Sequence, residues 1–180
     1  MKTENEKKKS SYLIFFIMIA TSMLLMYFTT YLNSERILDH FWFSETRLFM
    51  TLIMGSVMMV VMLAFMWKMY QSNRANILII LFAAILFSAG VFLVRSQATV
   101  NDVDYMEAMI PHHSIAILTS SRSQIEDPRV RELADSIIEA QRREIKEMAW
   151  LIRDIRENGI AESAMEAEER AVPEFSGSSD

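Results

Sequence analysis

The sequence predicts an all-α protein in which three transmembrane helices precede an extracytoplasmic helical hairpin domain. Three observations support this fold class: long uncharged stretches in the first half, charge gathered in the second half, and scarce helix breakers. The 180 residues are 52% hydrophobic and 23% charged, with 4 Gly and 3 Pro. Residues 96–180 hold 18 of the 23 Asp and Glu. This separation indicates a membrane part followed by an acidic part that faces water.

Three uncharged stretches are each long enough to cross a bilayer, which requires roughly 20 apolar residues. They lie at about residues 11–34, 48–67 and 75–94. We therefore expect a membrane domain over residues 11–95, after a short cytoplasmic N-terminus at residues 1–10. The first stretch is too long for a signal peptide and lacks a clear cleavage site, so we expect it to be retained.

Basic residues predict the orientation of the chain. Lys2 and three lysines at 7–9 precede the first span, and Lys68 and Arg74 flank the second loop, which contains no acid. The positive-inside rule places both segments in the cytoplasm. Three crossings then leave residues 96–180 outside. We expect a multi-pass protein of the cytoplasmic (inner) membrane with a periplasmic or extracellular C-terminal domain.

Two features of the membrane part are interpreted as packing. His40 lies among aromatic residues beside a span, which is typical of the bilayer interface, and a role as an extra ligand is the lesser alternative. A row of methionines recurs at every fourth position of the second span. Flexible apolar packing explains this row better than a path for soft metal ions. Its members are Met50, Met54, Met58, Met62 and Met66.

The charged half contains the pattern of two helices over residues 96–158. Apolar residues recur at helical spacing from about Asn101, and Asn101 or Asp102 is the candidate N-cap. Asp127, followed by proline, is the start signal of a second helix, and Gly159 is its stop signal. We expect an antiparallel hairpin, followed at residues 159–180 by an acidic, flexible tail.

Each of the two helices places unusual side chains on its apolar face. In the first helix, the seam consists of Met106, Met109, His113 and Ala116, with His112 beside it. The corresponding seam of the second helix consists of Val130, Leu133, Ile137, Gln141, Glu144, Met148, Leu151 and Ile155. This seam follows the alternating steps of three and four residues that packed helices use.

Folding the helices against each other brings the unusual residues to one level. His113 is expected near Gln141, Met109 near Glu144, and Met106 near Met148. Thioether and imidazole ligands together suit Cu(I) or Ag(I). The alternative is a satisfied polar network without metal, in which His113 bonds to Glu144 and His112 to water or Gln141.

The segments "DVDYMEAMIPHHSIAI" and "LADSIIEAQRREIKEMAWL" resemble the domain of unknown function 305 family over about residues 101–152. The resemblance implies a ferritin-like helical fold, and some members are periplasmic copper-binding proteins of the CopM type. It also implies metal binding through Met109, His112, His113 and Met148, with Gln141 and Glu144 as candidates. Ala108 and Thr119 stand where the family often has methionine, so two soft ligands are missing here.

We therefore expect a membrane-tethered, extracytoplasmic metal-binding protein that buffers or hands on Cu(I), Ag(I) or another soft metal ion. The alternative is a non-catalytic dimerisation or interaction module whose His, Gln and Glu cluster is structural. A di-iron enzyme is a weaker interpretation, because the chain has no Glu-x-x-His pair, and we expect no enzymatic activity. The acidic domain disfavours nucleic acid as a partner. A homodimer is expected, because a hairpin of about 55 residues buries little surface alone.

Overall fold

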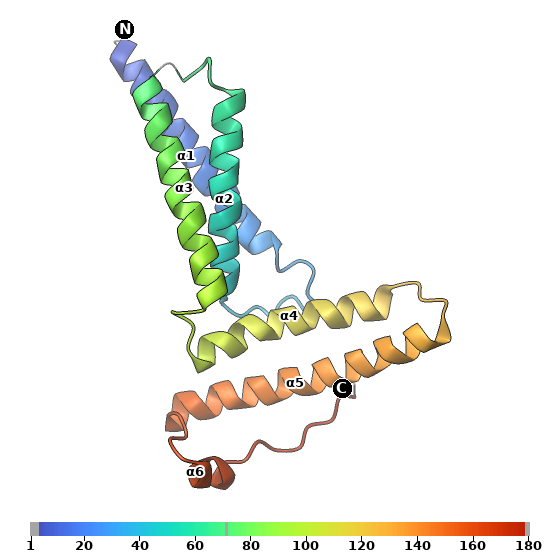
Figure 1. The fold of residues 1–180 in the computed structure, drawn as a ribbon. Helices are drawn as coiled ribbons and strands as arrows, with labels where there is room; N and C mark the ends of the chain where they lie inside the picture. The colour runs from blue at the N-terminus through green and yellow to red at the C-terminus, as the bar shows by residue number, and fades with distance from the viewer. Residues whose placement is uncertain (1–3, 71, 179–180) are drawn as a thin grey trace. The chain divides into compact units, whose positions relative to one another are not determined.

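The computed structural model describes residues 4–70 and 72–178. These residues form six α-helices and no β-strand, so the all-α prediction is confirmed. In chain order, the helices are α1 (Glu4–Thr29), α2 (Glu45–Phe65), α3 (Asn73–Ser96), α4 (Asp102–Arg122), α5 (Pro128–Asn158) and α6 (Ala164–Glu169) (Figure 1).

The chain divides into two compact units. The N-terminal unit consists of Met1–Thr30 and Glu45–Thr99, and the C-terminal unit consists of Tyr31–Ser44 and Val100–Asp180. Residues 31–44 thus belong with the C-terminal unit, although their position in the sequence suggested a loop of the membrane domain. The boundary between the units therefore falls at three places in the chain.

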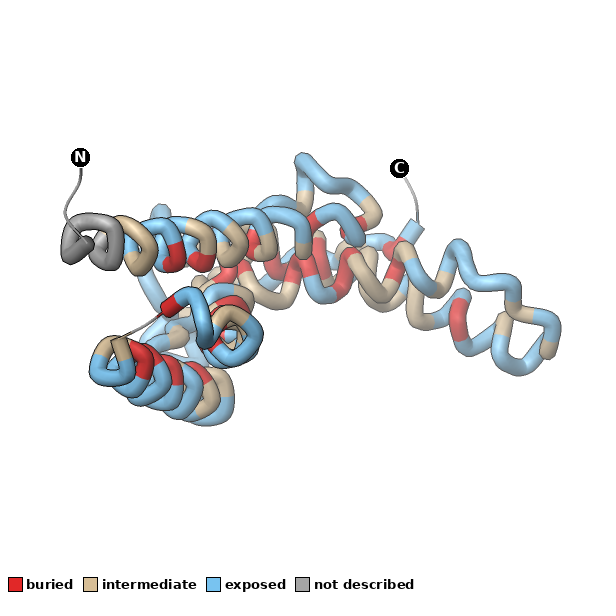
Figure 2. The backbone as a smooth tube through the Cα atoms, turned by 90° about the horizontal axis from the view of Figure 1, so that it is seen from above, coloured by how far each residue is buried: buried red, intermediate tan, exposed pale blue. Residues whose placement is uncertain are grey.

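Three helices of the N-terminal unit are long and apolar enough to cross a membrane: Ser10–Thr29, Glu45–Phe65 and Asn73–Ser96. At most 33% of the most apolar window of each is buried, and Figure 2 shows many exposed positions along the chain. Surfaces this apolar are unfavourable in water and suited to lipid.

The first apolar helix, α1, ends at Thr29, five residues before residue 34, where the first uncharged stretch was expected to end. Thr29 and Thr30 each donate a side-chain hydrogen bond to a carbonyl three residues earlier, which competes with helical bonding. The guanidinium of Arg47 also donates to the Thr30 carbonyl oxygen at 2.7 Å. A cation at this place satisfies a carbonyl that the end of the helix leaves free.

Small residues allow the helices of the N-terminal unit to approach closely. The helix α2 packs against both α1 and α3. A Cβ atom at Gly55 would overlap Met23 of α1, and one at Gly90 would overlap Ile53 of α2. Glycines at such crossings are typical of packed helices in membranes, where van der Waals contact drives association.

The C-terminal unit is built on the hairpin of α4 and α5, whose start signals are confirmed. The Asn101 side chain accepts from two backbone N–H groups and forms a capping box with Asp104. Asp127 caps α5, and Gly159, at φ 83°, follows its last residue. Glycine adopts this left-handed conformation without the steric cost that other residues incur.

The buried core between α4 and α5 differs from the predicted seam at two positions of α5. Its buried members are Met106, Ile110, Ile117, Ile145, Met148 and Ile152. Val130 and Leu133 of the predicted seam are instead 47% and 59% exposed. Near the loop, α4 offers polar groups, and Arg131 donates to the Ser120 carbonyl at 3.0 Å. The apolar stripe of α5 therefore turns away from Val130 and Leu133 toward Ala134.

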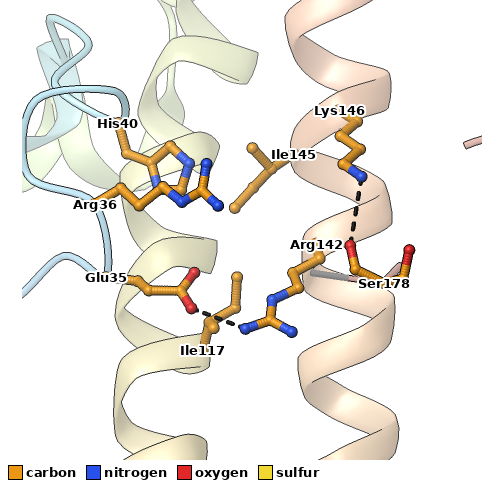
Figure 3. A pocket seen from close by; sticks show the side chains of 8 residues that line it. All are labelled: Glu35, Arg36, His40, Ile117, Arg142, Ile145, Lys146 and Ser178. Atoms are coloured by element: carbon orange, nitrogen blue, oxygen red, sulfur yellow. Dashed lines mark hydrogen bonds and ion pairs between the residues drawn. The ribbon is translucent and has the colours of Figure 1, made fainter. Parts of the chain in front are cut away.

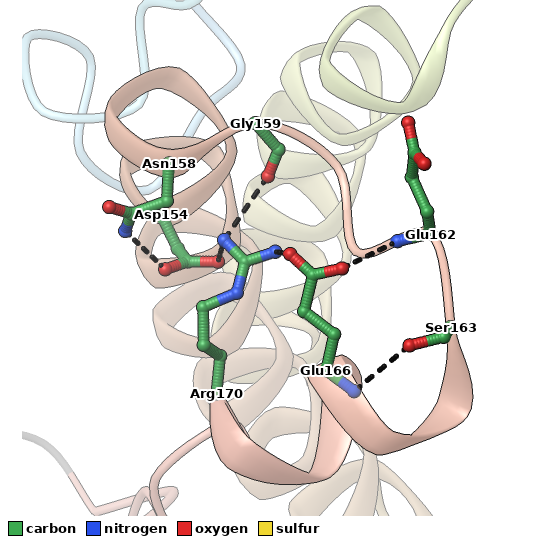
Figure 4. A network of polar contacts seen from close by, with 7 residues as sticks. All are labelled: Asp154, Asn158, Gly159, Glu162, Ser163, Glu166 and Arg170. Carbon is green, nitrogen blue, oxygen red and sulfur yellow. Dashed lines mark hydrogen bonds and ion pairs between the residues drawn. The ribbon is translucent and has the colours of Figure 1, made fainter.

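Beyond α5, the described tail residues make specific contacts with the hairpin. Arg170 forms ion pairs with Asp154 and with Glu166 of α6, and it donates to the Gly159 carbonyl (Figure 4). Gly177 packs so closely on Glu139 of α5 that no Cβ atom would fit. These contacts tie the tail to α5, while the predicted mobility of residues 159–180 stays a prediction.

Candidate functional site

His113 lies in the α4–α5 seam and uses both of its ring nitrogens. Its Nδ1 atom lies 2.9 Å from the Met109 carbonyl oxygen, and Nε2 lies 2.7 Å from Oε2 of Glu144. The side chain of His113 is 10% exposed and that of Glu144 is 39% exposed. The predicted partner of His113 was Gln141, one helical turn away. The observed bond is instead the one expected for a polar network without metal.

The geometry fixes where the protons of His113 lie. A carbonyl oxygen only accepts hydrogen bonds, so Nδ1 carries a proton and donates it to Met109. The Nε2 atom of His113 can therefore be either protonated or unprotonated. It either donates to the Glu144 carboxylate as part of an imidazolium, or it accepts a proton from a neutral Glu144. Without that extra proton, Nε2 presents a lone pair toward the position that Glu144 occupies.

His112, which the sequence placed in the same cluster, is exposed. Its ring centroid lies 6.2 Å from that of His113, with the ring planes at 69°. Consecutive helical residues point about 100° apart, which explains why only one of the two imidazoles enters the seam. His112 thus lies beside the His113–Glu144 pair, at the surface.

The thioethers form the apolar part of the predicted cluster. Met106 and Met148 are 6% and 9% exposed, and both belong to the buried core that Met109 also packs against. Gln141 is half-buried on α5. The structure thus brings His113 to Glu144 directly and gathers the three methionines in one hydrophobic cluster of the same seam.

The donor set limits which metal ions would fit. Within residues 4–70 and 72–178, no group of three or more His, Asp or Glu side chains could hold a metal ion. A zinc site would therefore lack its usual nitrogen and oxygen donors. His113 and Glu144 would need thioether ligands to complete a coordination sphere, and thioethers favour Cu(I). The residues present fit a soft monovalent ion better than a harder divalent one.

Residue 114 links the seam to the segment 31–44, a connection that the sequence did not reveal. Ser114 is fully buried, and its Oγ accepts from the Glu35 N–H at 2.8 Å. It also lies 2.8 Å from Nδ1 of His40. Burial lowers the pKa of His40, partly offset by Glu35. His40 is therefore a neutral partner of Ser114 rather than only an interfacial residue.

Further contacts hold the segment 31–44 in place. Glu35 forms an ion pair with Arg142 at 3.0 Å. The Tyr31 hydroxyl donates to the Trp42 carbonyl at 2.7 Å, and Trp42 packs against the core of the hairpin. Arg156 lies 5.9 Å from the Trp42 ring centroid and pairs with the buried Glu107. The seam residues thus lie in a three-part unit, not in an isolated hairpin.

Comparisons with known proteins give one family match and one similar protein. Residues 95–177 match the family described as Domain of unknown function (DUF305), in agreement with the resemblance seen in the sequence. The chain is also 38% identical over 92 residues to "Uncharacterized protein L153" of Acanthamoeba polyphaga mimivirus. That alignment covers 50% of this chain and 59% of the viral protein. No solved structure matches the chain.

Proposed function

We propose that the protein is a membrane-anchored metal-binding protein whose C-terminal unit binds Cu(I) or Ag(I) in the α4–α5 seam. The observation that carries the proposal is the pair of bonds made by His113. Nδ1 donates to a backbone carbonyl, and Nε2 faces a carboxylate. Histidines that bind metals usually hold one ring nitrogen by such a bond and use the other as the ligand.

A small movement would make room for the ion. His113 and Glu144 would have to move apart to hold an ion between them. Nε2 of His113 and Oε2 of Glu144 are now 2.7 Å apart. Glu144 is the more exposed partner and would rotate outward, and Met109, Met106 or Met148 would supply sulfur. Gln141 and the exposed His112 are further candidates at the rim.

The cellular setting is part of the same proposal. The three apolar helices would anchor the protein in the cytoplasmic membrane, with the N-terminus inside. The C-terminal unit would lie in the periplasm or outside the cell, where it would buffer the ion or hand it on without catalysing a reaction. Two units would pair as a homodimer with a ferritin-like, four-helix arrangement. The apolar side chains of Val130 and Leu133, exposed on α5, support a second helical partner.

A second candidate function is supported by the same histidine. Both ring nitrogens of His113 already have partners in the protein, so the pair can act without metal. The C-terminal unit would then be an interaction module in which His113 and Glu144 set the register of α4 against α5. A buried polar pair commonly has this role in helical assemblies.

Metal counting separates the two functions. The full chain, purified in detergent, is saturated anaerobically with Cu(I) or Ag(I), freed of unbound ion by gel filtration, and analysed for metal. The variants are His113→Ala and the double variant Met109→Leu/Met148→Leu. The control is Met165→Leu, because Met165 is 71% exposed on α6.

The proposal predicts that His113→Ala and the double variant each lose about one ion per chain and that the control loses none. The difference between parent and variant excludes ions held by methionines of α2, which all these chains share. Equal metal content in the parent and the variants would contradict the metal site. The interaction module would then be the favoured function of the C-terminal unit.

A further inference from the structure

A second feature of the C-terminal unit is a cavity between residues 31–44 and the hairpin. Its volume is about 120 Å³. The floor is formed by Ile117 and Ile145, which are 0% and 8% exposed. Charged side chains stand above this floor (Figure 3). A space of this size holds a few water molecules or one small polar group.

Cations outnumber the anion on the walls of the cavity. Arg36, Arg142 and Lys146 line it, against the single carboxylate of Glu35. Arg142 pairs with Glu35, and Arg36 pairs with Asp39 at 3.9 Å, so neighbouring carboxylates offset part of this positive charge. Arg142 and Glu35 are 27% and 23% exposed, so their charges are only partly screened by water. An apolar floor strengthens the attraction of such cations for an anion.

The cavity also contains a neutral hydrogen-bond donor. The Ser114 hydroxyl accepts from the Glu35 N–H, and in one of the two His40 tautomers it donates its own proton to Nδ1 of His40. Neutral His40 then carries its proton on Nε2, the nitrogen remote from Ser114. His40 lines the cavity, so this N–H adds a donor to the guanidinium and ammonium groups.

We propose that this cavity binds a phosphate group. Guanidinium groups match the geometry of phosphate oxygens, and a lysine adds a mobile positive charge. Lys146 already donates to the carbonyl oxygens of Ser176 at 3.2 Å and of Ser178, which also lines the cavity, at 3.5 Å. The Lys146 ammonium is therefore directed at oxygen acceptors beside the cavity. The Arg142–Glu35 pair would remain, with the phosphate added on the open side of Arg142. This site is independent of the proposed metal site.

The phosphate group could come from two sources. One is a free phosphate or a small phosphorylated molecule. The other is a lipid headgroup, since the segment 31–44 connects directly to α1 and α2. The segment also exposes apolar side chains suited to a bilayer interface, among them Leu38 at 89% and Phe43 at 56%.

The test uses the full chain in a maltoside detergent, which contains no phosphate. In one arm, inorganic phosphate is titrated by calorimetry in a chloride buffer of matched ionic strength. In the other, phosphatidylglycerol is added and bound lipid is counted by native mass spectrometry. The variants are Lys146→Gln and Arg142→Gln/Lys146→Gln. Lys146→Gln leaves the Arg142–Glu35 pair intact, so it reports on the site even where the double variant unfolds.

The control is Arg143→Gln/Arg153→Gln, which removes two charges from exposed positions of the same helix. We expect the parent and the control to bind phosphate or the lipid within twofold of each other. Lys146→Gln should bind at least fivefold more weakly, and the double variant at least tenfold more weakly. Binding in only one arm identifies the source. Absence of binding in both arms, or equal weakening in the control, would overturn the proposal.

Discussion

His113 contacts Glu144 across the α4–α5 seam, with Nε2 of the imidazole 2.7 Å from Oε2 of the carboxylate. This bond joins residues 31 positions apart in the sequence. It is a direct polar connection between the two helices in the seam where the methionines gather. Its energy and its response to metal ions are therefore the first properties to measure.

The coupling between these two residues should be measurable without metal. A double-mutant cycle with His113→Ala and Glu144→Gln should give a coupling energy of about 0.5–1.5 kcal/mol, at the lower end of the range for contacting residues. The low value is expected because Glu144 is 39% exposed and water screens the pair. Thermal unfolding of the metal-free chain in detergent gives the four values. Strictly additive effects would show that the bond does not form.

Loss of the Ser114 hydroxyl should loosen residues 31–44. Ser114→Ala leaves the Glu35 N–H and the His40 ring without their partner, at a cost of about 1–3 kcal/mol. Hydrogen exchange at the Glu35 amide should accelerate while exchange within α5 changes little. Ser121→Ala is the control, because this exposed hydroxyl bonds only within α4. Unchanged protection of Glu35 in Ser114→Ala would contradict the observed bond.

Low pH should weaken the contact between His40 and Ser114. Burial lowers the pKa of His40, so the folded unit favours the neutral ring. The unfolded ring has a pKa of about 6.5. The contribution of His40 to the stability of the folded unit is therefore complete above about pH 6.5. It is lost as the pH falls below that value toward the lowered pKa. Hydrogen exchange of residues 31–44, measured from pH 7.5 to 5, should accelerate at low pH after correction for intrinsic rates.

His40→Asn provides the matched comparison, since its amide keeps an acceptor for Ser114 without titrating in this range. His112 and His113 are present in both chains, so their contributions cancel in the difference. An identical pH response in the parent and His40→Asn would assign the effect to another group.

The proposed orientation can be tested on a clean background, because the chain contains no cysteine. Glu169→Cys in α6 should react with a membrane-impermeant maleimide in intact cells. Lys68→Cys, in the loop between α2 and α3, should react only after the membrane is opened. Both positions are exposed, so differences in burial do not explain the contrast. The reverse labelling pattern would invert the assigned topology.

The features that could be predicted from the sequence depend on residues close together in the chain, such as helix caps and helical spacing. Asp127 and Gly159 marked helix ends correctly, and Asn101 was one of two candidate caps together with Asp102, because capping depends on a few neighbouring residues. The methionines Met106 and Met148 were rightly placed in the core, since helical spacing defines a face. The family resemblance over residues 101–152 lies within the matched region 95–177.

The features missed depend on contacts between distant segments. Nothing near His40 indicated that it meets Ser114, 74 residues later. The register of α4 against α5 was displaced by one turn, because periodicity fixes a face but not the level of the partner. Leu133 was assigned to the seam for the same reason, although the opposing part of α4 is polar and leaves it exposed.

The most direct test of the metal proposal is X-ray absorption spectroscopy of the full chain loaded with one equivalent of Cu(I). The account predicts a mixed shell of sulfur and nitrogen or oxygen neighbours. Because His113→Ala and Met109→Leu/Met148→Leu lose the ion of this site, any copper that they hold elsewhere should not reproduce the mixed shell. A shell that contains only sulfur and is unchanged in both variants would show that copper binds elsewhere in the chain. The His113–Glu144 pair would then be a structural contact between two helices.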